Sequence, residues 1–294
     1  MRWSGRRAGS LLPPRGASHA AQRLQRLPPQ PCWKLLGGLT NRASPHASSG
    51  TLRDPQAQAD AVERFLAQEF AALKLRFRRG DWRDDTNALE AVCVRVGNRL
   101  ELLVDCNQGW RMAWDTQAPW SLKDALAVAR ELERLEVYWM EEPLHRAHYA
   151  GMGVLREATD VRLAAGEMTR QLHELRELLT GGCVDVVRPD AALVGGIRGL
   201  RRIALMAQEH HITFTPHTWT NGMGVTANAH LVAGLTDAHF LEYPFDPPEW
   251  SLARRDFLME EPLTTDAGGW IELSDAPGMG YTPDEGRPLA TRIA

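Results

Sequence analysis

Apolar and polar positions alternate in blocks from about residue 50 onward, and the blocks predict helices and strands in turn. Residues 54–70 carry apolar side chains at Ala61, Val62, Phe65 and Phe70, which is the spacing of one helix face. In residues 72–77 every second side chain is apolar, which is the period of a strand. This region therefore begins with a helix that is followed by a strand.

The same unit repeats as far as residue 242. We predict further strands over 102–105, 137–140, 161–165, 184–187, 212–215 and 239–241, separated by helices near 86–96, 122–132, 149–158, 169–179, 196–207 and 225–235. A weak strand that contains Pro45 and His46 precedes them near residues 43–49. Alternating strands and helices predict a parallel sheet. An open doubly wound sheet is the alternative to a closed barrel, but no GxGxxG motif follows the first strand.

Length and charge limit the class of protein. The 294 residues fit one barrel of the (β/α)8 type, about 250 residues long, or two smaller domains. No apolar run approaches the roughly 18 residues of a membrane-spanning helix, so we expect no membrane partner. Residues 1–53 hold nine Lys or Arg and no Asp or Glu, so the rest of this chain of net charge −3 carries −12. An acidic body gives no reason to expect a nucleic-acid partner.

The first 30 residues differ from the rest in composition. They are rich in Arg, Pro, Ala and Ser and contain no acid, which is a composition similar to that of an organelle transit peptide. The pairs at Pro13 and Pro28 interrupt the amphipathic helix that such a peptide needs, so we interpret the segment as a disordered arm. The four cysteines are far apart and form no CxxC pair, which favours a reducing, cytoplasmic location.

Acidic residues follow three of the predicted strands. Asp105, Glu141 and Glu167 each stand at the carboxyl end of an apolar run. A carboxylate at the end of a buried strand requires a cation, and the carboxyl ends of barrel strands meet at one mouth. We predict that the three acids bind one hard divalent metal ion, although helix capping is an alternative for any single acid. Glu142 directly follows Glu141, so it must face the other way, towards a helix or a salt bridge.

Two later strand ends offer a candidate base. Asp190 and His217 follow adjacent predicted strands. A carboxylate behind an imidazole fixes its tautomer and raises its basicity, which a general base requires. A structural histidine is the alternative for His217 taken alone. Trp219 follows two residues later and is expected to line a pocket, whereas the Trp-rich segment 110–120 is expected to pack against the barrel or form a lid.

Several short motifs occur in an order that resembles a known family. They are Lys74-x-Arg76, Asp105-x-Asn107, Trp139-Met140-Glu141-Glu142-Pro143, Gly166-Glu167, Arg188-Pro189-Asp190 with Gly195-Gly196, Pro216-His217 and Leu241-Glu242. Over about residues 31–290 the chain resembles the enolase superfamily, mandelate racemase subgroup, and its acid-sugar dehydratases. The resemblance implies a modified TIM barrel, (β/α)7β.

The resemblance also implies a site and its chemistry. Mg²⁺ would be bound by Asp105, Glu141 and Glu167, and a His217–Asp190 dyad would remove the proton alpha to a carboxylate. The enediolate that results would be held by the metal, and Glu242, as an acid, would hydrogen-bond it from the opposite side.

A domain organisation follows from the same resemblance. Members of the family carry an N-terminal α+β capping domain that closes the site, and we expect most of it to be missing here. We expect the disordered arm over 1–30, a remnant of the capping domain over 31–42, the barrel over 43–270 and a tail over 271–294 that packs back towards the capping region. The resemblance favours a homo-oligomer.

One position departs from the pattern of the family. The family usually has Lys-x-Lys on the second strand, with the second lysine as the opposing base, but here that place holds Arg76. A guanidinium stays protonated and is a poor base. Our hypothesis is a sugar-acid dehydratase, a hydro-lyase that forms a 2-keto-3-deoxy acid, in which His217 is base and then acid. Lys74 and Arg76 would bind the substrate carboxylate, with Asn107 and Trp219 nearby.

Two alternatives stay open at this point. One is a racemase or epimerase of a carboxylate substrate, with Lys74 as the second base. The other is a catalytically silent barrel that binds a metal or a partner, because an uncapped site admits water and loses contacts that select a substrate.

Overall fold

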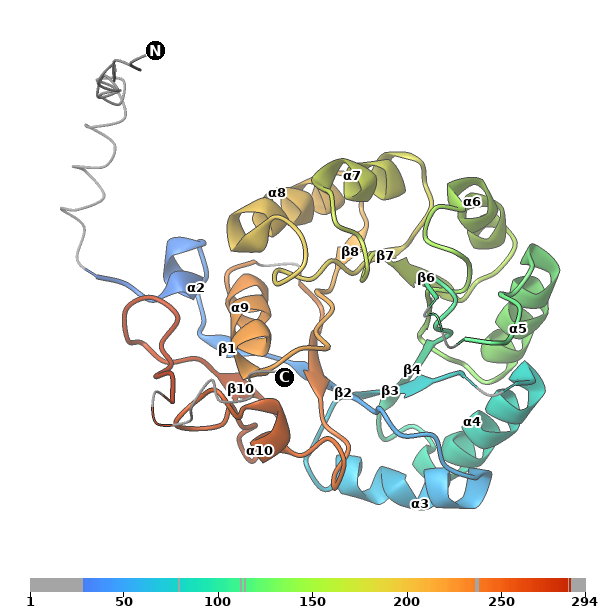
Figure 1. Cartoon of the computed structure of the whole chain (residues 1–294), viewed down its shortest axis with the longest axis horizontal. Coiled ribbons are helices and arrows are strands. Elements are labelled where there is room, and N and C mark those ends of the chain that lie inside the picture. Colours follow the sequence, from blue (N-terminus) through green and yellow to red (C-terminus); the bar gives the residue numbers. More distant parts are fainter. Residues whose placement is uncertain are drawn as a thin grey trace, which may run out of the picture.

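A computed structural model describes residues 29–78, 80–111, 113, 115–235, 238–284 and 286. Within these residues, eight parallel strands form one sheet in the order β8-β7-β6-β5-β4-β3-β2-β9. An isolated parallel bridge between Phe214 and Ala238 joins β8 to the segment before β9. The sheet therefore closes into a ring that is surrounded by helices (Figure 1), and the predicted barrel is confirmed.

The described strands and helices alternate as predicted. The strands are β2 (Pro45–Ser48), β3 (Ala72–Arg76), β4 (Glu101–Asp105), β5 (Trp139–Glu141), β6 (Arg162–Ala165), β7 (Val186–Val187), β8 (Thr213–Phe214) and β9 (Leu241–Pro244). The seven helices between them are α3 (Pro55–Leu66), α4 (Trp82–Val96), α5 (Leu122–Arg134), α6 (Tyr149–Glu157), α7 (Leu172–Thr180), α8 (Gly196–Glu209) and α9 (Gly222–Ala233). Among the described residues this is the (β/α)7β order.

Some element boundaries differ from the prediction. Helix α4 begins at Trp82 rather than 86, because the Asp81 side chain accepts a hydrogen bond from Arg83 N and caps the helix there. Helix α9 begins at Gly222 in the same way, capped by Asn221. Strand β9 runs through Glu242 instead of ending before it. Glu242 pairs with His46 of β2 in the register of the two strands.

The two ends of the described chain meet beside the barrel. Strand β1 (Arg42–Ala43) pairs antiparallel with β10 (Ile271–Glu272), and Cys32 N of α2 (Cys32–Leu35) donates to Gly278 O at 2.8 Å. Helix α10 (Leu252–Arg255) lies between β9 and β10 in the sequence. The arm expected over residues 1–30 lies outside the described residues except for its last two, and the proposed domain boundaries stay predictions. No described helix has the length and apolar character needed to cross a membrane.

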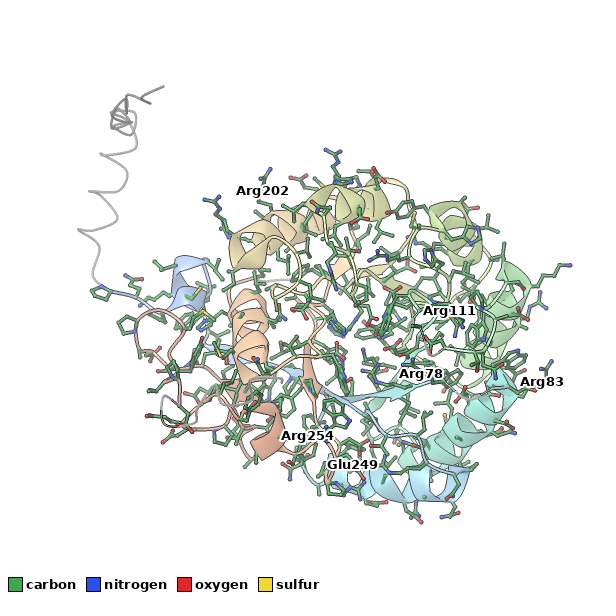
Figure 2. All side chains as sticks on the ribbon, viewed as in Figure 1. Arg78, Arg83, Arg111, Arg202, Glu249 and Arg254 are labelled. Carbon is green, nitrogen blue, oxygen red and sulfur yellow. The ribbon has the colours of Figure 1, made fainter. Side chains whose placement is uncertain are left out.

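The core has an outer and an inner part. The outer part fills the space between the sheet and the helices. Arg202 lies on the exposed side of α8, away from this core (Figure 2). The inner part lies inside the ring and consists of Ala72, Leu103, Trp139, Ala164, Val186 and Phe240. Alternate residues of a strand face the same side. For five of these six residues, the residue two positions later in the chain therefore also points inward and lies one layer nearer the carboxyl ends of the strands. These five residues are Lys74, Asp105, Glu141, Arg188 and Glu242.

Candidate functional site

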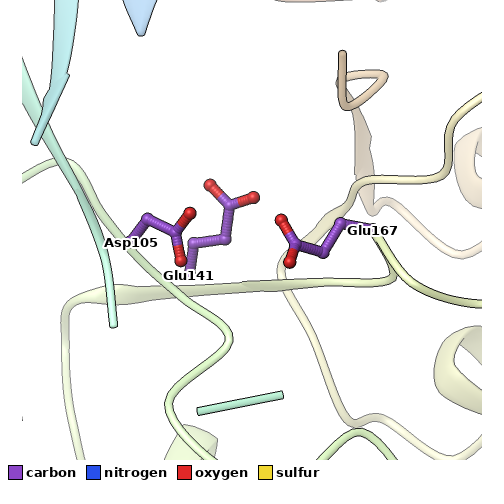
Figure 3. A group of neighbouring side chains, drawn as sticks. All are labelled: Asp105, Glu141 and Glu167. Atoms are coloured by element: carbon purple, nitrogen blue, oxygen red, sulfur yellow. The ribbon is translucent and has the colours of Figure 1, made fainter. Parts of the chain in front are cut away.

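Three carboxylates converge at the carboxyl-terminal mouth of the barrel. Asp105 is the last residue of β4, Glu141 is the last residue of β5, and Glu167 stands two residues after β6. One oxygen of each lies within 4.8 Å of the others. Figure 3 shows the three side chains directed toward a common point from three separate strand ends. The structure thus brings together the three acids that the sequence singled out.

The donor set of this cluster fits a hard divalent cation such as Mg²⁺. All three ligand atoms are carboxylate oxygens, which Mg²⁺ prefers over nitrogen or sulfur. The residues are nearly inaccessible, with exposed fractions of 0% for Asp105 and Glu141 and 3% for Glu167. Buried carboxylates at this spacing repel one another and need positive charge between or beside them.

Glu142 faces away from this point, as expected from the alternation of a strand, but its partner differs from the prediction. Its Oε1 accepts from Gly166 N at 2.7 Å and from Glu167 N at 3.4 Å, so it holds the backbone of the loop that carries Glu167. No described cation pairs with it. Burial and the charge of Glu167 raise the pKa of Glu142 to about 8. A side chain on Gly109 would collide with its Oε2, so the glycine allows this close approach.

His217 lies beside the cluster, between the carboxylates of Asp190 and Glu167. Its Nδ1 is 3.3 Å from Asp190 Oδ2, and its Nε2 is 3.2 Å from Glu167 Oε2. Burial opposes the charge of the imidazolium, but Glu242, Glu167 and the hydrogen bond with Asp190 outweigh it and raise the pKa of His217 to about 9. Asn228 Nδ2 donates to Asp190 Oδ1 at 3.2 Å and to His217 O at 2.9 Å, so α9 holds both members of the pair.

Lys74 is completely buried among acids. Its Nζ lies 2.9 Å from Glu141 Oε2, 2.8 Å from Glu242 Oε1 and 3.6 Å from Asp105 Oδ2. Burial opposes the charge, but Glu141 and Glu242 outweigh it and raise the pKa of Lys74. For Glu242, burial is outweighed by Lys74, His217 and Arg188, which hold its pKa well below the usual value. Lys74 is therefore a cation here, and Glu242 is an anion.

Arg76, Asn107 and Trp219 form a group on the β3–β4 side of the mouth. Arg76 Nη1 donates to Asp105 Oδ2 at 3.1 Å and to Asn107 Oδ1 at 3.2 Å. The Arg76 guanidinium carbon lies 4.0 Å from the centre of the Trp219 ring, which also packs against Trp250. The Trp219 ring therefore packs against the arginine and is not uncovered on that face. Asn221, two residues after Trp219, caps α9 with its side chain.

Two residues contact the site that were not among the predicted site residues. Trp110 Nε1 donates to Glu167 Oε1 at 2.5 Å, so the Trp-rich segment touches a candidate metal ligand. Arg188 is fully buried and donates to both Glu141 and Glu242. The period-two alternation of Val186 and Arg188 could have placed Arg188 inside the barrel, because it directly follows β7. Nothing in the sequence indicates the contact of Trp110.

The chain is similar to known proteins over most of its length. Residues 56–287 match the model of the family described as enolase C-terminal domain-like. The chain is 27% identical over 267 residues to a D-gluconate dehydratase of Thermoproteus tenax, covering 87% of this chain and 51% of the relative. It is 26% identical over 253 residues to an L-Ala-D/L-Glu epimerase of Bacillus subtilis, covering 85% and 64%.

A solved structure gives the same result for the fold. A racemase from Streptomyces coelicolor A3(2) with bound magnesium superimposes with a TM-score of 0.75 at 25% identity, over 88% of this chain and 66% of that one. The chain spans between half and two thirds of the length of these relatives. The match over residues 56–287, together with the shared barrel, shows that this chain belongs to the enolase C-terminal domain-like family of the enolase superfamily.

Proposed function

We propose that this protein is a Mg²⁺-dependent hydro-lyase that removes the proton alpha to the carboxylate of an acid sugar and expels water to give a 2-keto-3-deoxy acid. The observation that carries the proposal is the position of His217, whose Nε2 contacts Glu167 of the three-carboxylate cluster and whose Nδ1 lies against Asp190. Dehydratases of sugar acids among the relatives support the reaction class.

Asp105, Glu141 and Glu167 would hold the metal ion. Bound there, Mg²⁺ supplies positive charge that offsets the three acids and stabilises negative charge developing on the substrate carboxylate. Lys74 and Arg76 would help to bind that carboxylate from the side of β3, with Asn107 beside them. Glu242 is anionic in its present contacts, so it needs a proton before it can donate to an enediolate.

His217 would move the proton in both halves of the reaction. Asp190 holds Nδ1, which leaves Nε2 to accept the alpha proton as the C–H electron pair moves into the enediolate. The same proton then passes from Nε2 to the hydroxyl on the next carbon, the C–O bond breaks, and water leaves. The resulting enol tautomerises to the 2-keto-3-deoxy acid. The carboxylates that raise the pKa of His217 to about 9 must be offset by positive charge before its imidazole is free to act as a base at neutral pH.

An epimerase is the second candidate, favoured by the relative from Bacillus subtilis. It requires a base on the face opposite His217, and the candidates are Lys74 and Arg76. Lys74 is held as a cation by Glu141 and Glu242, and Arg76 is a guanidinium bound to Asp105. These contacts favour chemistry on one face of the substrate and therefore dehydration.

The test is a screen of aldonic and aldaric acids with the purified full chain in D₂O, with and without Mg²⁺. Release of a 2-keto acid that depends on Mg²⁺ and is lost in His217→Asn is the expected result. Exchange or inversion at the alpha carbon without release of a keto acid would favour the epimerase. A chain that binds Mg²⁺ but neither exchanges the alpha proton nor releases water from any acid sugar would support a silent barrel.

A further inference from the structure

Arg188 connects two strands of the site through a single side chain. It follows β7, is 0% exposed, and its guanidinium carbon lies 4.7 Å from the centre of the Trp139 ring in the layer beneath. Its Nε donates to Glu141 Oε1 at 2.8 Å, and its Nη2 donates to Glu242 Oε2. One planar group therefore binds a candidate metal ligand on β5 and the acid on β9.

Lys74 binds the same two carboxylates from the other side. Its Nζ contacts the second oxygen of each, Glu141 Oε2 at 2.9 Å and Glu242 Oε1 at 2.8 Å. Glu141, Lys74, Glu242 and Arg188 thus form a closed ring of alternating charges, which we call the charge ring. Every member of the charge ring is fully buried.

The charge ring fixes the orientation of Glu141. Each of its two oxygens receives one donor, Arg188 Nε on Oε1 and Lys74 Nζ on Oε2, so the plane of the carboxylate cannot rotate without breaking a buried charged contact. A carboxylate oxygen keeps a further lone pair for another partner. Partners behind a metal ligand commonly set how well that ligand is aimed.

We propose that Arg188 is a positioning residue of the metal centre, and that its planar fork, rather than its charge, sets the affinity for Mg²⁺. The inference rests on the proposed function only in taking Asp105, Glu141 and Glu167 as the metal ligands. The charge of Arg188 and the orientation that it imposes on Glu141 have opposite effects on the affinity for Mg²⁺. A cation beside a divalent site repels the ion, so loss of charge alone would tighten binding, whereas loss of orientation weakens it.

Binding of Mg²⁺ alone to the full chain, measured by isothermal titration calorimetry, separates the two effects. Arg188→Lys keeps the charge but cannot span both acids with one planar group, and Arg188→Met removes the charge. We expect both variants to bind Mg²⁺ about 10- to 100-fold more weakly than the parent chain. An affinity for Arg188→Lys equal to that of the parent, or tighter binding by Arg188→Met, would overturn the proposal.

A double variant protects the test against misfolding, because Arg188→Met leaves two buried carboxylates that share Lys74 as the one remaining cation of the charge ring. Arg188→Met combined with Glu242→Gln removes one cation and one anion, so the net charge is unchanged and Lys74 still pairs with Glu141. If charge decided affinity, this variant would bind like the parent chain. We expect binding at least about tenfold weaker because Glu141 Oε1 has lost its donor, and parent-like binding would refute the role of Arg188.

Arg255 provides a matched control. It is also buried, it lies 4.0 Å from the centre of the Tyr243 ring, and it binds both oxygens of Asp256 at 2.6 Å. Arg255→Lys should lower the melting temperature without changing the affinity for Mg²⁺. If the parent chain itself fails to bind Mg²⁺, the proposed function fails; if the parent binds and Arg188→Lys binds equally well, only the role of Arg188 fails.

Discussion

The interior of the barrel contains two layers that are built by the same strands and differ completely in chemistry. Ala72, Leu103 and Val186 belong to the lower layer, and the residues two positions later, Lys74, Asp105 and Arg188, belong to the upper one. The lower layer is apolar, so its burial stabilises the fold. The upper layer is equally buried but charged, and it is tolerated only because its charges pair with one another.

The difference shows how a barrel separates stability from chemistry along a single strand. A step of two residues, roughly 7 Å, takes the strand from a packed core to an ionic site. The lower layer gives the upper one a rigid base, as with the ring of Trp139 beneath Arg188. Substitutions in the two layers should therefore have separable effects on metal binding and on unfolding.

The largest effect is expected from a candidate ligand in the upper layer. Glu141→Gln removes one carboxylate from the three and leaves Lys74 and Arg188 facing a neutral amide. We expect the affinity for Mg²⁺ to fall by more than about 100-fold, beyond the loss typical of residues behind a ligand. Calorimetry checks this, with Glu101→Gln at the exposed start of β4 as the control. An unchanged affinity would remove Glu141 from the site.

The next largest effect is expected from His217, and it separates proton transfer from metal binding in the upper layer. His217→Asn removes the imidazole but keeps a polar group that can contact Asp190. With a substrate found by the screen, turnover should fall by about 10²- to 10⁴-fold, while the affinity for Mg²⁺ should not fall, because no candidate ligand is removed. Steady-state kinetics and calorimetry on the same preparation measure both. Retained turnover would show that another group is the base.

In the lower layer the effect should fall on stability alone. Leu103 is fully buried inside the ring, and Leu103→Ala should lower the free energy of unfolding by about 2–5 kcal/mol because it leaves a cavity. Urea unfolding measures the loss. The affinity for Mg²⁺ of the folded variant should stay close to that of the parent chain; a large loss would mean that the two layers are not separable.

The smallest effect concerns His46, which lies at the border of the layers. It packs against Trp139 and Phe240, and no described residue offers either ring nitrogen a hydrogen bond. Burial first, then the charges of Arg188, Lys74 and His217, lower its pKa well below the usual value, against the opposing charge of Glu242. The folded chain therefore keeps His46 neutral at a pH where the unfolded chain protonates it.

Above about pH 6.5 His46 is neutral in both the folded and the unfolded chain, so its ionisation does not change the stability. Below that value only the unfolded chain takes up the proton, and the free energy of unfolding falls by at most about 1.4 kcal/mol per pH unit. His46→Phe should remove this dependence. Unfolding free energies of both proteins at pH 7 and pH 5 test it, because the variant should lose less stability between the two values. An equal loss in both proteins would show that His46 contributes nothing to acid sensitivity.

Periodicity and motif order were enough to predict most of the fold and the main acids of the site. The alternation of strand and helix patterns specified the barrel, and the acids at strand ends specified which side chains would meet, because the carboxyl ends of parallel strands share one mouth. Asp105, Glu141 and Glu167 could be singled out from their place at or just after the end of a predicted strand, and so could His217 and Asp190. The place of a residue relative to a predicted strand is a local feature, so it can be recognised directly in the amino-acid sequence.

Only the tertiary structure decided how these side chains pair. The charge ring, the hydrogen bond of Trp110 to Glu167 and the stacking of Arg76 on Trp219 all join residues from different strands or loops. Such pairings depend on strand register, on side-chain reach and on which buried charge lies nearest. The sequence alone determined which side chains lie at the mouth of the barrel. Three-dimensional packing determined their partners, because a buried charge pairs with the counter-charge that lies beside it in the closed barrel.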